Sequence, residues 1–194
     1  MGSREKILSA IKKNQPLLTP LPILAPGTKS GAGLKEQFIQ TLTSIGGFAI
    51  EVNNINEVIP HLKNKFPAST RMVNTLVSLS HQLEAESLQI DPHELKNVEI
   101  TLLQGQFGVA ENGAIWLTEE QMGDRVLPYI CEHLVLVLCV TEIVPTLQEA
   151  YERIGSSQYG LGTFLAGPSK TADIEQSLVL GAHGPKSLTV FLIP

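Results

Sequence analysis

The sequence is poor in the residue types that mark most specialised protein classes. Of its 194 residues, only two are cysteines, 5% are aromatic and 17% are charged. Two thiols, at Cys131 and Cys139, supply neither the ligands of an iron–sulfur cluster nor, alone, a structural zinc site. Four of the five histidines, His61, His81, His93 and His133, have no ligand-like partner at helical or Cys/His spacing. We therefore predict no metal and no cofactor, and we interpret the cysteines as small buried residues in a reducing compartment.

Basic stretches and long apolar runs are also missing. Lys and Arg total 14 against 19 Asp and Glu, for a net charge of −5. A non-specific nucleic-acid binder needs a basic face, so nucleic acid is not an expected partner. The longest purely apolar run, Leu134–Val140, spans seven residues, far short of a membrane span. With no long apolar stretch at the N-terminus either, we expect a cytoplasmic protein.

Hydrophobic residues make up 43% of the sequence, which is enough for the core of one globular domain. Residues 1–33 are expected to form a helix, capped by Ser3, and then a Pro/Gly-rich arm with four prolines and three glycines between Gln15 and Gly33. This arm is either a flexible tether or a segment packed on the body or on a neighbouring subunit. Residues 34–194 are expected to form a single α/β domain.

From residue 34 onward, helical and strand patterns alternate. We predict helices at 34–45, 54–66, 78–88, 146–154 and 171–178, and strands at 48–52, 71–76, 98–103, 114–118, 133–140, 163–166 and 187–193. Such alternation is typical of an open, mostly parallel α/β sheet with helices on both faces. Ligands of such sheets bind beyond the carboxyl ends of the strands, so loops that follow strands are the candidate sites.

The first candidate is the turn Glu111-Asn112-Gly113, between two strand-like runs. Asn-Gly is a strong turn signal, because both residues tolerate positive φ. A glutamate on such a turn could be a nucleophile toward an activated acyl group or a general base. It could equally be the solvated tip of a hairpin.

The second candidate is the segment 166–175, where a strand runs into Gly167-Pro168 and a helix is predicted to follow. Gly167 permits a close backbone approach, and Ser169 or Thr171 could cap the helix, with Asp173 in its first turn. Free amides at this helix start, beside Lys170, would form an anion site. Ordinary capping is the alternative. The segment is not a phosphate-binding P-loop, since Pro-Ser stands where that motif needs Lys.

The third candidate is the loop 181–186, which precedes the last strand and contains His183 and Gly184. The histidine could move a proton or hold an anion, or it could be a structural loop residue. We predict that all three candidates meet in one cleft at the carboxyl edge of the sheet, with Glu111 opposite Ser169 and Lys170.

The second and third segments, GPSKTADIE at 167–175 and LGAHGPK at 180–186, resemble the signature of the LUD domain, the LutC/YkgG family of lactate-utilisation proteins. The stretch 108–117 is similar to another common stretch of that family. The resemblance covers roughly residues 34–194 and the helical start of the chain. It implies a fold of the NagB/RpiA/CoA-transferase type and a role beside two iron–sulfur partner proteins in oxidising L-lactate to pyruvate.

Glu111-Asn112-Gly113 is also similar to the Glu-Asn-Gly stretch of family I CoA-transferases, which use the glutamate as nucleophile. Here Ala110 stands where those enzymes usually have serine, and the chain is too short for both halves of such an enzyme. The leading hypothesis is therefore a subunit of a lactate-oxidising system that carries no redox centre. An acyl- or CoA-transferase using Glu111 and a regulatory protein that binds a small anion are the alternatives.

Overall fold

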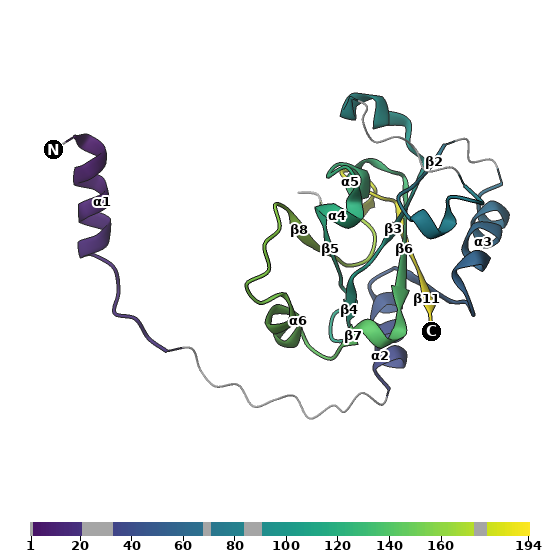
Figure 1. Ribbon diagram of the computed structural model, residues 1–194, viewed down its shortest axis with the longest axis horizontal. Coiled ribbons are helices and arrows are strands. Elements are labelled where there is room, and N and C mark those ends of the chain that lie inside the picture. Colours follow the sequence, from purple (N-terminus) through teal and green to yellow (C-terminus); the bar gives the residue numbers. More distant parts are fainter. Residues whose placement is uncertain (1, 21–32, 68–70, 84–90, 173–177) are drawn as a thin grey trace.

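The computed structural model describes residues 2–20, 33–67, 71–83, 91–172 and 178–194 (Figure 1). Its central sheet has five strands in the order β1, β11, β6, β3, β2, and every neighbouring pair is parallel. The strands are β1 (Phe48–Glu51), β2 (Met72–Asn74), β3 (Ile100–Gln104), β6 (His133–Cys139) and β11 (Ser187–Ile193). The predicted open, mostly parallel α/β sheet is confirmed.

Strand β6 shows why this sheet is covered on both faces. Leu134, Leu136 and Leu138 join a core cluster that includes Phe38 and Leu42 of α2 (Leu34–Ser44). The intervening valines, Val135 and Val137, join a second cluster with α3 (Val58–Lys65). Since successive side chains of a strand point to opposite faces, an unbroken apolar run requires apolar cover on both sides. Helices therefore flank both faces, as predicted.

A second sheet, which the sequence analysis did not predict, packs beside the first. Its order is β7, β4, β5, β8, and only the pair of β4 and β7 is parallel. One face contributes to the cluster around α2, and the other is covered by α6. The elements are β4 (Phe107–Val109), β5 (Ile115–Thr118), β7 (Ile143–Val144), β8 (Gly162–Leu165) and α6 (Leu147–Ile154).

Most predicted helices form, with shifted bounds. α1 (Ser3–Lys13) begins after Gly2, so Ser3 is its first residue and not its cap. The predicted helix 54–66 is divided into η1 (Ile55–Glu57) and α3, and Asn54 caps it as expected. Of the predicted helix 78–88, the described part forms only η2 (Val77–Leu79). The remaining helical segments are η3 (Pro92–Asn97), α4 (Glu119–Met122), α5 (Leu127–Ile130) and η4 (Val140–Glu142).

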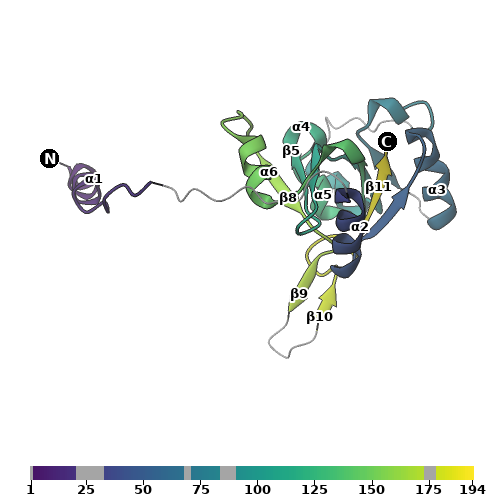
Figure 2. The ribbon, with the colours of Figure 1, turned by 90° about the horizontal axis from the view of Figure 1, so that it is seen from below.

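The predicted helix at 171–178 is wrong. Residues on either side of 173–177 form an antiparallel hairpin of β9 (Lys170–Ala172) and β10 (Leu178–Leu180), in which Thr171 is paired with Val179. Figure 2 shows this hairpin projecting from the two sheets. Across the described ranges, no helix is long and apolar enough to cross a membrane.

The two cysteines differ in burial, and this difference predicts their reactivity. Cys131 is 2% exposed, and burial raises the pKa of its thiol to about 11, whereas Cys139 is half-buried. The thiolate is the reactive form. A thiol reagent near neutral pH should therefore modify Cys139 much faster than Cys131 in the native protein, and both after denaturation. Peptide mass mapping checks this, with Cys139→Ser as the control that abolishes native labelling.

The same pKa shift has a consequence for stability. Because burial in the folded state raises the pKa of the Cys131 thiol above its ordinary value of 9.0, the fold is more stable below that pH, where the thiol is neutral. This contribution is lost as the pH rises from about 9 toward 11. In the labelling experiment described above, rapid modification of both cysteines of the native protein near neutral pH would contradict the burial of Cys131.

Candidate functional site

A cavity of about 210 Å³ brings together two of the three candidate segments. Three parts of the chain line it: α5, the end of β8 with the turn that follows, and the loop before β11. The lining residues are Pro128, Tyr129, Phe164, Leu165, Ala166, Gly167, Pro168, Ser169, His183, Gly184 and Pro185. We call this the motif cavity, because its last six residues, from Gly167 onward, come from the two signature segments.

The two signature segments are bonded to each other through their backbones. The Ser169 N–H donates to the Pro185 carbonyl at 2.9 Å, and the Gly181 N–H donates to the Ser169 carbonyl at 3.1 Å. Gly184 allows this approach, since a Cβ there would lie 3.1 Å from the Ser169 Cβ. Pro168 and Pro185 are buried on either side. The cavity wall is therefore fixed by main-chain contacts.

Three polar side chains of the motif cavity are available to a ligand. Within the described part of the chain, the Ser169 hydroxyl, the His183 ring and the Tyr129 hydroxyl have no hydrogen-bond partner. No carboxylate is among the lining residues. Hydroxyl and imidazole groups can donate to an anion, and the cavity has no negative charge to oppose one. The arrangement can hold a small carboxylate.

The position of the motif cavity differs from the expectation. Tyr129 lies just before β6, and Pro185 lies just before β11, so the cavity lies at the amino ends of these two parallel strands. The sequence analysis placed it at the carboxyl edge. The rule on carboxyl ends applies to loops that leave the strands of one parallel sheet. Here the loops enter those strands or belong to the second sheet.

The expected helix amides do not form the anion site, because a hairpin stands in place of the helix. The Ser169 N–H is already bonded, and Thr171 lies within β9. Asp173 lies outside the described residues. The Lys170 ammonium donates to the Ile45 carbonyl at 2.5 Å instead of facing the cavity. Of the predicted anion-binding residues, Gly167, Ser169, His183 and Gly184 line the motif cavity.

The turn Glu111-Asn112-Gly113 forms as predicted, but it does not line the motif cavity. Gly113 has φ +69°, and the Asn112 side chain accepts from the Ala114 N–H at 3.0 Å. The Glu111 carboxylate accepts the Leu147 N–H at 2.8 Å, at the amino end of α6. Thr146 caps the same helix by accepting from the Glu149 N–H. The contact assigns Glu111 a capping role.

The Glu111-Asn112-Gly113 turn is nevertheless linked to the motif cavity through the end of α2. A Cβ on Gly113 would lie 3.0 Å from the Leu42 nitrogen, and one on Gly167 would lie 2.9 Å from the Ile45 carbonyl oxygen. Both turns thus pack on the last residues of the same helix. Sequence reasoning missed Tyr129 and Phe164, since neither belongs to a motif and α5 was not predicted.

Comparisons with known proteins give a consistent family. A family model described as LUD domain matches residues 5–193. Lactate utilization protein C of Geobacillus thermodenitrificans is 25% identical over 203 aligned residues, which cover 98% of this chain and 80% of that protein. The same-named protein of Bacillus pumilus is 31% identical over 93 residues, 45% of this chain and 39% of that protein. YkgG of Escherichia coli is 24% identical over 137 residues, which cover 64% of this chain and 59% of that protein.

A solved structure supports the fold. A DUF162 family protein from Deinococcus radiodurans superposes with a TM-score of 0.68 at 20% identity, covering 86% of this chain and 99% of that one. At this identity the likeness concerns the fold alone. It agrees with the parallel sheet and its flanking helices.

The contact of Glu111 predicts a stability effect. Glu111→Ala removes the acceptor of the Leu147 N–H and should lower the free energy of unfolding by about 0.5–2 kcal/mol, as loss of a cap does. Glu111→Gln keeps an acceptor oxygen and should lose less. Chemical denaturation measures both. An alanine variant as stable as the wild type would contradict the capping role.

Proposed function

Because the chain belongs to the LUD domain family, we propose that it is a subunit of an L-lactate oxidation system, without a redox centre of its own, that works with iron–sulfur partner proteins. The similarity to Lactate utilization protein C along 98% of this chain is the observation that carries this proposal. An iron–sulfur cluster needs four protein ligands, usually thiolates, and the chain has two cysteines. The proposal therefore assigns electron transfer to the partners.

We further propose that the motif cavity binds the small carboxylate on which the system acts, of the 2-hydroxy or 2-oxo acid class. Its volume of about 210 Å³ lies below the range of roughly 300–1,000 Å³ typical of drug-sized ligands. Ser169 and His183 would bind the carboxylate, and the Tyr129 hydroxyl would be a third hydrogen-bonding group in the cavity. The free donors and the lack of a lining carboxylate support this class of ligand.

Growth tests the role in lactate utilisation. A strain that lacks this gene, and has no second copy, should grow poorly on L-lactate and normally on glucose. The wild-type gene should restore growth, and a gene encoding Ser169→Ala with His183→Ala should not. Normal growth of the deletion strain on L-lactate would contradict the proposed function.

Calorimetry tests the ligand class separately. L-lactate or pyruvate should bind the purified protein, and either Ser169→Ala or His183→Ala should weaken binding about tenfold, the effect of losing one hydrogen bond to a charged group. His81→Ala, an exposed histidine on another surface, is the matched control and should bind like the wild type. Binding that both site variants leave unchanged would place the carboxylate elsewhere.

A further inference from the structure

A second cavity, of about 300 Å³, lies between the outer face of the second sheet and α6. It shares no residue with the motif cavity. Its lining residues are Gln106, Phe107, Trp116, Thr118, Glu119, Glu120, Arg153, Ile154, Ser157, Gln158 and Tyr159. We call it the aromatic cavity. We propose that it binds an uncharged, planar nitrogen heterocycle with an exocyclic amino group, the chemistry of an adenine-type base.

Three aromatic rings give the aromatic cavity its preference for a flat ligand. The Trp116 ring lies 6.4 Å from the Phe107 ring and 5.4 Å from the Tyr159 ring, between centroids. Trp116 and Phe107 are buried, whereas Tyr159 is 43% exposed and is the ring that a ligand can reach from solvent. Gly162 allows this packing, because a Cβ there would lie 2.4 Å from the indole. Aromatic rings favour stacked or edge contacts with other rings.

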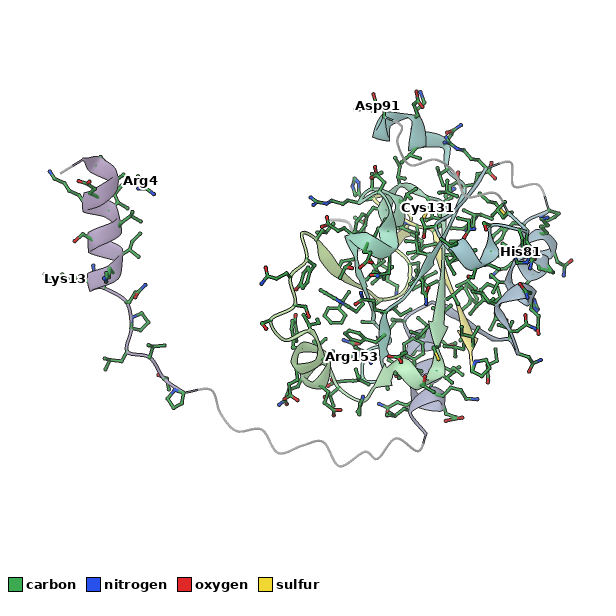
Figure 3. The ribbon with its side chains drawn as sticks, in the orientation of Figure 1. Arg4, Lys13, His81, Asp91, Cys131 and Arg153 are labelled. Atoms are coloured by element: carbon green, nitrogen blue, oxygen red, sulfur yellow. The ribbon has the colours of Figure 1, made fainter. Side chains whose placement is uncertain are left out.

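Two charged side chains that line the aromatic cavity are already paired with other groups. The Arg153 guanidinium pairs with Glu142 and lies 4.7 Å from the centroid of the Phe107 ring (Figure 3 labels Arg153 on α6). The Glu119 carboxylate accepts from Arg125 at 2.7 Å and from the Gly160 N–H at 3.0 Å. These two lining charges are therefore engaged by partners.

Glu120 and Gln106 are among the polar side chains of the aromatic cavity that have no such partner. In the ranges that the structure describes, neither the Glu120 carboxylate nor the Gln106 side-chain amide makes a hydrogen bond. Glu120 can only accept, whereas Gln106 can accept and donate. An amino group would donate to Glu120, and a neighbouring ring nitrogen would accept from Gln106. The lining carries two carboxylates and one guanidinium, so an anionic ligand is disfavoured.

The single tryptophan provides a direct probe, since Trp116 is the only one in the chain and lines the aromatic cavity. Adenosine should quench or shift its fluorescence with a saturable dependence on concentration. Purine riboside, which lacks the amino group, should bind about tenfold more weakly, the effect of one hydrogen bond to a charged group. Adenosine should also raise the melting temperature.

Variants separate this site from others. Glu120→Gln should weaken adenosine binding about tenfold and leave purine riboside binding unchanged, while Tyr159→Leu should weaken both. Glu94→Gln makes the same charge change at an exposed residue of η3 and should have no effect. Ser169→Ala, in the motif cavity, should leave adenosine binding intact. Circular dichroism and thermal melting confirm that each variant is folded.

Three results would overturn the proposal. The first is the lack of any saturable change in Trp116 fluorescence and in melting temperature with adenosine. The second is equal binding of adenosine and purine riboside, which would remove the role of the amino group. The third is adenosine binding that Glu120→Gln leaves unchanged or that Ser169→Ala abolishes.

Discussion

The close contact between the last turn of α2 and two glycine turns is the constraint on which the candidate site depends. Gly113 and Gly167 both have positive φ, +69° and +71°, and both pack where a Cβ would lie about 3 Å from the backbone of Leu42 or Ile45. Only glycine meets both requirements without strain. These contacts fix where β8 ends and the signature segment begins. The backbone hydrogen bonds of Ser169 with Pro185 and Gly181 then position the loop that contains His183.

Local and periodic signals were enough to predict much of the fold. The unbroken apolar run of β6 predicted a strand buried on both faces, and Thr146 predicted the start of α6. The Asn112-Gly113 turn was also predicted correctly, because glycine there reflects a backbone requirement that the sequence states directly. Each of these features depends on residues that are close together in the chain.

The features that were missed depend on distant partners. Ser and Thr near 169–171 suit a helix cap, but the same residues are favoured in turns, and pairing with β10 decided the outcome. The hydrogen bond between the Glu111 carboxylate and the Leu147 N–H could not be predicted, because the two residues lie 36 positions apart. The amino-end position of the motif cavity follows from the insertion of β11 between β1 and β6. No short segment of the sequence contains that strand order.

The two cavities are linked by the Phe164 ring, which contacts two rings that line the aromatic cavity, and they differ in charge. Phe164 lines the motif cavity, and its ring centroid lies 4.7 Å from that of Trp116, which lines the aromatic cavity. The motif cavity has no lining carboxylate, whereas the aromatic cavity has two. One therefore suits an anion and the other a neutral heterocycle. A ligand that shifts one of these two rings would change its packing against the other.

The central claim is that the two signature segments build one carboxylate site at the amino ends of β6 and β11. Heteronuclear NMR of the ¹⁵N-labelled protein, titrated with L-lactate and with pyruvate, tests it most directly. The account predicts that the largest amide shifts occur at Gly167, Ser169, His183 and Gly184, with small shifts at 111–113. Shifts centred on the Glu111 turn, or no saturable shift anywhere with either acid, would contradict it.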